Sequence, residues 1–167
     1  MAATYEPIAT TTLGSNQNNV EFTGISSSFT DLILVVAARG TASSTSTGSN
    51  IIFNGITTTT YSATLLYGTG STAASTRNSN ASNIGFVEIP AATAASDLFG
   101  ISIYHIMNYA NTTTNKTVLI RGNNQEQVRA IVGLWRSTSA ITSVRFTPTS
   151  GQVATGSTFT LYGIAAA

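Results

Sequence analysis

The sequence predicts an all-β protein, an antiparallel β-sandwich of the jelly-roll kind. Its apolar segments are short and rich in β-branched and aromatic residues, and clusters of Gly, Asn, Ser and Thr separate them. No segment has the apolar periodicity of a long amphipathic helix. About ten short strand candidates without helical interruptions favour a sandwich over an α/β fold, and a closed barrel is the remaining β alternative.

The strand candidates follow these apolar runs along the chain. They lie at Tyr5 to Leu13, Val20 to Phe22, Leu32 to Ala38, Ile51 to Phe53, Ile84 to Ile89, Phe99 to Tyr109, Thr117 to Arg121, Gln127 to Trp135, Ser143 to Thr147 and Thr158 to Ile164. Two spacers, Gly40 to Asn50 and Gly68 to Asn83, consist almost wholly of Gly, Ala, Ser, Thr and Asn. We expect both to be long loops at one end of the sandwich, with flexible linkers as the alternative.

Two candidates indicate how the strands are covered. Ser143 to Thr147 alternates, so Val144 and Phe146 lie on one face and Arg145 on the other, as in a half-buried antiparallel strand. Leu32 to Val36 is apolar at every position. We therefore expect this strand to be central, with the core on one side and a loop or a neighbouring subunit on the other.

Composition favours one folded domain, residues 1–167, that works in an assembly. The chain is 42% hydrophobic, which separates it from disordered sequences. Charged residues make up only 8% and the net charge is +1, so nucleic acid is not an expected partner. The solvated faces must be built from Ser, Thr, Asn and Gly, a composition that suits a surface shared with neighbouring proteins.

The sequence also restricts the cellular setting. It contains no cysteine, so it has no disulfide framework and no Cys-ligated metal site. Residues 1–6 lack the basic and apolar regions of a signal peptide, and no apolar run reaches the ~20 residues that span a bilayer. We expect synthesis in the cytoplasm and no membrane partner.

No constellation of residues predicts catalysis. His105, the only histidine, lies within an apolar strand and is expected to be packed or hydrogen-bonded there. Asp31 or Asp97 could complete a Ser-His-Asp set, but no nucleophile-elbow motif accompanies them. We expect a non-enzymatic protein without a metal or cofactor, and a glycan depolymerase is the remote alternative. The six carboxylates are dispersed: Glu6, Glu21, Asp31, Glu88, Asp97 and Glu126.

Four residues belong to types that are typical of interfaces. Trp135 and Arg136 are types that dominate binding energy, although Trp135 is equally compatible with the core of the sandwich. Tyr61 and Tyr67 flank polar residues in the way that glycan-binding aromatics do. These four residues form the candidate protein interface. The arginines are interpreted as one exposed residue per strand, for solubility and cross-strand pairing: Arg121, Arg129, Arg136 and Arg145.

Several stretches carry a family resemblance. They are Phe29 to Val35, Tyr61-Ser62, Leu66 to Gly68, Ile106 to Tyr109, Val132 to Ile141 and Gly156 to Ile164. Together they resemble small β-sandwich virion structural proteins of tailed bacteriophages, notably those that infect cyanobacteria and other marine bacteria. The resemblance extends over nearly the whole chain. Its most specific part is the Gly-Leu-Trp-Arg-Ser-Thr segment followed by the terminal Ser-Thr-Phe-Thr-Leu-Tyr-Gly-Ile strand.

The resemblance implies a protein exposed on the virion surface, without fixing its location on the particle. One expectation is a homotrimeric capsid decoration, or cement, protein that binds the major capsid protein or other virion proteins. The other is a tail or tail-fibre module that recognises a host surface glycan or protein. Strand candidates run from near the first residue to near the last, which favours a stand-alone decoration protein over the tip of a fibre.

Overall fold

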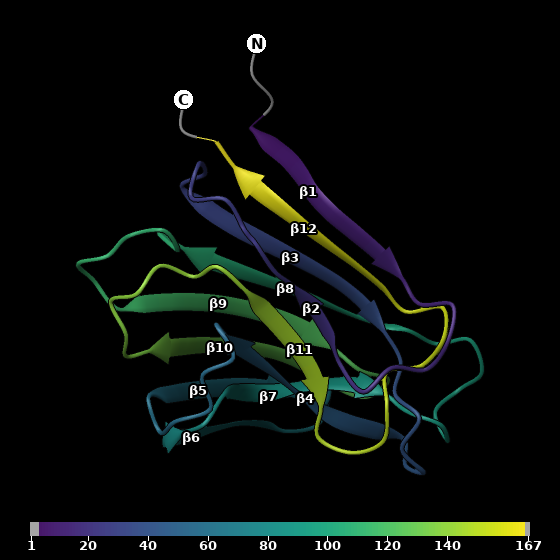
Figure 1. The fold of residues 1–167 in the computed structure, drawn as a ribbon. Helices are drawn as coiled ribbons and strands as arrows, with labels where there is room; N and C mark the ends of the chain where they lie inside the picture. The colour runs from purple at the N-terminus through teal and green to yellow at the C-terminus, as the bar shows by residue number, and fades with distance from the viewer. Residues whose placement is uncertain (1–3, 166–167) are drawn as a thin grey trace.

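The structure, a computed structural model, describes residues 4–165, which form two antiparallel sheets packed face to face (Figure 1). The large sheet has the strand order β1-β12-β3-β8-β9-β10-β5-β6, and the small sheet has the order β2-β11-β4-β7. The strand bounds are β1 Tyr5–Thr12, β2 Val20–Phe22, β3 Asp31–Ala38, β4 Ser46–Phe53, β5 Tyr61–Gly68, β6 Ala73–Ala81, β7 Ile84–Pro90, β8 Gly100–Met107, β9 Lys116–Asn123, β10 Val128–Trp135, β11 Val144–Pro148 and β12 Thr158–Ile164.

Strands that are far apart in the sequence pair in a nested order. Strand β1 pairs with β12, β2 with β11, β3 with β8, and β4 with β7. This is a long hairpin rolled into two sheets, the jelly roll, and the predicted fold class is confirmed. Two hairpins, β5-β6 and β9-β10, are inserted into this framework, and both extend the large sheet beyond β8.

The core lies between the sheets and is filled by alternate residues of each strand. In β11, Val144 and Phe146 are buried and Arg145 is not, as the alternation predicts. The rings of Phe146 and Phe159 meet edge to face, with centroids 5.1 Å apart, and so join the small sheet to the large sheet. In the part of the chain that the structure describes, no apolar helix is long enough to span a bilayer.

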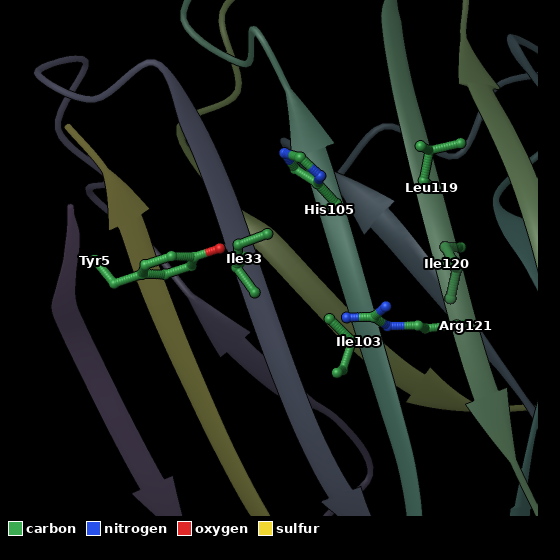
Figure 2. Close-up of a pocket in the computed structure, with 7 residues that line it drawn as sticks. All are labelled: Tyr5, Ile33, Ile103, His105, Leu119, Ile120 and Arg121. Carbon is green, nitrogen blue, oxygen red and sulfur yellow. The ribbon is translucent and has the colours of Figure 1, made fainter. Parts of the chain in front are cut away.

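Strand β3 occupies an inner position of the large sheet, between β12 and β8, as its apolar run predicts. Leu32, Leu34 and Val36 are fully buried in the core. Ile33 points to the opposite side of the sheet, where it is still almost covered. A side chain covers Ile33 in place of the expected loop or neighbouring subunit. Tyr5 extends from β1 and its hydroxyl lies beside Ile33 (Figure 2).

The loop prediction for the two polar spacers is wrong in part. Strand β4 already begins at Ser46, inside the first spacer, and β6 occupies 73–81 of the second. Strand β6 lies at the edge of the large sheet and pairs with β5 alone. Ser, Thr and Asn side chains are tolerated there because they remain hydrated while the backbone completes the ladder with β5. The polar composition of this spacer therefore gave no sign of strand β6.

Strand β5 is the other element that the apolar runs did not predict. Its inward residues Tyr61, Ala63 and Leu65 are buried, and the intervening residues point to the solvent side. The alternation runs unbroken from Tyr61 to Leu66, and the register shift in the pairing with β6 leaves the extra residue, Asn80, on β6. Together β5 and β6 widen the large sheet.

Candidate functional site

The large sheet has an outer face, which we define as the surface pointing away from the small sheet. Most of its exposed aliphatic side chains come from alternate positions of β5, β8, β9 and β10. Many are large and apolar, and they stay exposed in the folded chain. The most exposed aliphatic residues are Val128 at 66%, Leu66 at 58%, Val132 at 51%, Ile101 at 45% and Leu119 at 43%.

Strand β10 explains how the outer face arises. Ile131 and Trp135 point inward and are buried, whereas Val128 and Val132 point outward. Arg129 belongs to the inward set. The strand is therefore apolar on both sides, which is typical of strands covered on both faces. Monomeric proteins seldom leave such a surface open to water, and an extended apolar patch marks a contact site.

Shallow grooves run over the outer face. One groove of about 370 Å³ lies between β5, β9 and β10 and is lined by Thr64, Leu66, Leu119, Ile120, Ala130, Ile131 and Val132. A second lies beside it, where Tyr67 lines a hollow together with Leu66 and Val128. Both are predominantly apolar. They suit the side chains of another protein surface better than a small polar ligand.

A third groove, which we call the Arg121 groove, has a different character. It has a volume of about 240 Å³ and is lined by Tyr5, Ile33, Ile103, His105, Leu119, Ile120 and Arg121. Figure 2 shows the guanidinium of Arg121 reaching from β9 toward Ile103 on β8, with His105 further along the same strand. The groove thus combines an apolar floor with polar groups on its walls.

His105 is held in place by a carboxylate. Its Nε2 lies 3.0 Å from Oδ2 of Asp31 on the neighbouring strand, and the backbone N–H of Asn108 donates to Oδ1 of Asp31 at 2.6 Å. This is the hydrogen-bonded strand histidine that the sequence predicts. Within residues 4–165 no Ser or Thr hydroxyl hydrogen-bonds to the ring, so the His-Asp pair has no nucleophile beside it. No group of three or more metal-ligating side chains occurs among the described residues.

Two of the four residues proposed for the interface lie in the core. Tyr61 is 0% exposed and Trp135 is 2% exposed, and their rings stack with centroids 6.0 Å apart. The Tyr61 hydroxyl donates to the carbonyl of Ile56 at 3.0 Å and accepts from the N–H of Phe53 at 3.1 Å. Burial raises the pKa of this phenol, and its hydrogen bond to Phe53 opposes the shift. The interface prediction is wrong for Tyr61 and Trp135, because their side chains fill the space between the sheets.

The other two residues are partly accessible. Arg136 is half-buried and its Nη2 donates to the carbonyl of Thr59 at 2.8 Å and to Oδ1 of Asn80 at 3.0 Å. Tyr67 is half-buried beneath Arg129, whose Cζ lies 5.6 Å from the ring centroid. Of the four, only Tyr67 borders the outer face.

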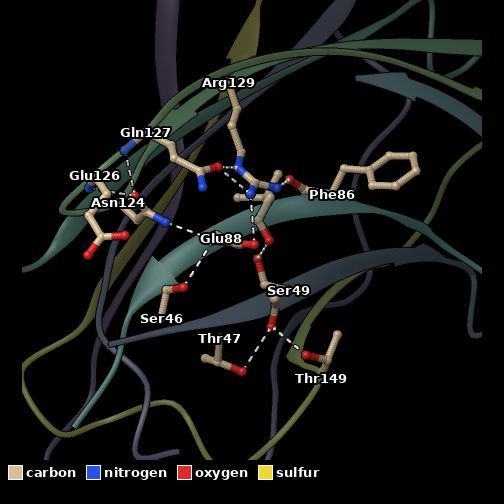
Figure 3. Close-up of polar contacts among 12 residues, drawn as sticks. Ser46, Thr47, Ser49, Phe86, Glu88, Asn124, Glu126, Gln127, Arg129 and Thr149 are labelled. Carbon is tan, nitrogen blue, oxygen red and sulfur yellow. Dashed lines mark hydrogen bonds and ion pairs between the residues drawn. The ribbon is translucent and has the colours of Figure 1, made fainter. Parts of the chain in front are cut away.

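Arg129 also departs from its predicted exposure. Its Nη2 lies 2.7 Å from Oε1 of Glu88, and its Nη1 donates to the carbonyl of Phe86 at 2.6 Å (Figure 3). Gln127 accepts from Nε at 3.0 Å, and Asn124 donates to Glu88 at 2.7 Å. This network crosses from the large sheet to β7 of the small sheet, so it positions β10 and the outer side chains that β10 carries.

The remaining arginines fit the prediction more closely. Arg145 pairs with its cross-strand neighbour Glu21, with Nε and Oε2 3.2 Å apart. Arg121 is exposed at the outer face. The apolar residues of the outer face were not predicted as a site, although one signal was available. Leu32 to Val36 is apolar at both alternate sets of positions, and β8 and β10 are largely apolar at both sets as well.

The comparisons with known proteins leave the family open. No family model matches the chain, and no curated protein matches it by sequence. Among solved structures, an exo-inulinase from Aspergillus awamori is 13% identical with a TM-score of 0.49, and the match covers 96% of this chain and 29% of the inulinase chain. The chain therefore spans less than a third of that protein.

Two smaller proteins match over nearly their whole length. The galectin LEC-6 of Caenorhabditis elegans is 10% identical with a TM-score of 0.34, and the match covers 94% of this chain and 96% of the galectin. A human SPRY domain is 11% identical with a TM-score of 0.24, covering 95% and 99% of the two chains. None of the three structures comes from a bacteriophage. Likenesses this distant carry no functional argument, and this chain is similar to them only as one β-sandwich is similar to another.

Proposed function

We propose that this chain is a structural protein of a bacteriophage particle, a homotrimeric capsid decoration protein that binds the major capsid lattice. In this role it acts on the virion surface as a binding protein, without catalysis and without a cofactor. The binding surface is the outer face of the large sheet. The family resemblance supports the setting, and the exposed apolar side chains of the outer face support the mode of binding.

The single observation that carries the proposal is the exposure of Leu66, Leu119, Val128 and Val132 on one side of a well-packed sandwich. Covering these side chains on a partner surface removes apolar area from water, which is the main favourable term in protein association. With 8% charged residues, little charge must be desolvated at the same time. Many copies on a symmetric lattice then bind with high avidity and stabilise the assembled shell over its free subunits.

The experiment uses phage particles produced without this chain and purified protein added back. We expect wild-type protein to sediment with the particles and to raise their resistance to heat and low ionic strength. The double variant Val128→Lys/Val132→Lys should bind at least about tenfold more weakly, because two ammonium groups would enter an apolar contact. Both positions are more than half exposed, so the free variant should keep its stability to within about 0.5 kcal/mol.

Ile56→Lys is the matched control. Ile56 is also an exposed apolar residue, 39% accessible, but it lies in the connection between β4 and β5 and outside the outer face. The Ile56→Lys variant should bind the particles as tightly as the wild type does. The proposal is wrong if the double variant binds as tightly as the control, or if particles without the protein are as stable as complete ones. Sedimentation equilibrium of the free protein should give three times the 17.3 kDa chain mass.

A second candidate is a tail or tail-fibre module that recognises a host surface glycan or protein. The Arg121 groove favours it, because an aromatic residue, Tyr5, lines the same groove as the polar groups of His105 and Arg121, a combination found in many sugar-binding sites. Antibody labelling of whole particles separates the two candidates. Many copies over the head support decoration, and a few copies at the tail support adhesion.

A further inference from the structure

We propose that the Arg121 groove binds a carboxylate of the partner protein, the side chain of an Asp or Glu that is flanked by apolar residues. The inference rests on the proposed function and adds the chemistry of the partner surface to it. The apolar contacts of the outer face, by themselves, would accept any apolar surface of suitable shape. A single charged group set into that face would select one register on the partner.

The first observation is that Arg121 has no partner within the fold. Among residues 4–165, no hydrogen bond or ion pair involves its guanidinium, although the group extends over the groove (Figure 2). Four of the other five arginines donate to acceptors of this protein: Arg39, Arg129, Arg136 and Arg145. Arg77, exposed on the edge strand β6, is likewise without such a contact among the described residues, but it lies outside the groove. Arg121 therefore keeps its fork of N–H donors available for an acceptor from outside.

The second observation is that the groove contains no acid to neutralise Arg121. Its lining residues are aromatic, aliphatic or basic. The nearby carboxylate of Asp31 already accepts from His105 and from the N–H of Asn108. An incoming carboxylate thus meets a positive group without a competing negative one, and electrostatic complementarity favours an acidic side chain over an amide of the same shape.

The third observation is the surroundings of the charge. Ile33 and Ile103 form an apolar floor beside the guanidinium, and Leu119 adds an exposed apolar side chain at the margin. A partner residue flanked by aliphatic side chains would cover this floor and exclude water from the ion pair. Exclusion of water strengthens the pair, because the interaction between charges grows as the local dielectric falls. A sugar, with hydroxyls around its ring, would leave several of them unpaired over the isoleucines.

The test measures binding of short probes to the free protein by two-dimensional NMR. The probes are acetyl-Val-Glu-Val-amide, the matched acetyl-Val-Gln-Val-amide, and sodium glucuronate. We expect the Glu peptide to shift the resonances of Arg121, Ile103 and His105 and to bind about tenfold more tightly than the Gln peptide. Equal binding of the two peptides, or tighter binding of glucuronate than of the Glu peptide, overturns the proposal.

Arg121→Gln should reduce the affinity for the Glu peptide to that for the Gln peptide. Arg77→Gln is the matched control, because Arg77 is an exposed arginine on β6, outside the groove, and should leave the affinity unchanged. If Arg121→Gln binds like the wild type, the proposal is wrong. The particle-binding experiment with Val128→Lys/Val132→Lys reports separately on the proposed function, since neither substitution removes a group that contacts the carboxylate.

Discussion

Nη2 of Arg129 lies 2.7 Å from Oε1 of Glu88, in an ion pair that joins the large sheet to the small sheet (Figure 3). The side chain of Arg129 is 9% exposed and that of Glu88 is 26% exposed. Ser46 and Asn124 donate to the other oxygen of Glu88, at 3.0 and 2.7 Å. The pair is therefore satisfied on both sides and fixes the position of β10 beneath the outer face.

Arg129→Met should lower the free energy of unfolding by about 3 kcal/mol, because it leaves the Glu88 carboxylate without its positive partner inside the sandwich. The measurement is urea denaturation followed by fluorescence. Arg129→Met/Glu88→Gln should lose less than the single variant, since no unpaired charge remains. The matched control is Arg145→Met at the more exposed pair with Glu21, which should lose less than about 1 kcal/mol. Similar losses at the two sites would contradict the structural role given to Arg129.

Tyr61→Phe should destabilise the fold by about 1–2 kcal/mol, because the N–H of Phe53 and the carbonyl of Ile56 would lose their buried partner. Thermal unfolding by circular dichroism measures the loss. Tyr162→Phe serves as the control, since no hydrogen bond of the Tyr162 hydroxyl occurs in the described part of the chain. Trp135, the only tryptophan, should emit at short wavelength and resist quenching by acrylamide. Ready quenching would place it at the surface after all.

Lys116, the only lysine, gives an expected pH dependence. It is buried at the start of β9, and its Nζ donates to the carbonyls of Thr114 at 2.7 Å and Thr138 at 3.3 Å. Burial lowers the pKa of this amine below its ordinary value of 10.5. Between the lowered pKa and 10.5 the unfolded chain holds a proton that the folded chain has released, so the free energy of unfolding rises with pH in that window.

The measurement compares wild type with Lys116→Met. The other titrating groups are the same in both proteins, so their contributions cancel in the difference between the two free energies of unfolding. The difference in the free energy of unfolding, wild type minus variant, should increase as the pH is raised toward 10.5. At lower pH, where Lys116 is protonated in both states, the difference should be constant. A difference that stays flat up to pH 10.5 would mean that the amine is solvated in the folded protein.

Gly163→Ala should destabilise the protein by about 1–3 kcal/mol, because a Cβ at this position would collide with the ring of Phe29. Gly163 lies on β12 and leaves room for Phe29 to pack flat against the strand. Gly14→Ala is the control, since a Cβ there meets no atom within 4 Å, and its effect should stay within about 0.5 kcal/mol. Equal effects in denaturant titrations would remove the packing explanation.

Local pattern predicted most of the fold. Short alternating runs such as Val20 to Phe22 and Ser143 to Thr147 became strands at nearly the expected positions. Strand β6 follows a different rule. Residues 73–81 carry no apolar alternation, and they are extended because β5 offers them a ladder of hydrogen bonds. A strand at a sheet edge is specified by its neighbour as much as by its own residues.

The site was less predictable than the fold. Aromatic and arginine residues were expected at the surface because those types dominate interfaces, yet Trp135 and Tyr61 pack in the core. The surface that remains open is aliphatic. Its residues, Val128 and Val132 among them, are ordinary core types, so nothing in their identity distinguishes a buried set from an exposed one.

The sequence by itself determined that this chain is a charge-poor β-sandwich whose strands are apolar at alternate positions. Only the tertiary structure decided which side of each strand faces the core. In β10 both alternate sets are largely apolar, and hydrophobicity alone does not choose between them. The set containing Arg129 faces inward with Ile131 and Trp135, and Glu88 and the carbonyl of Phe86 on the opposing sheet satisfy its guanidinium there. That choice left Val128 and Val132 on the outer face, and such a choice depends on contacts between strands about 40 residues apart, which no local pattern contains.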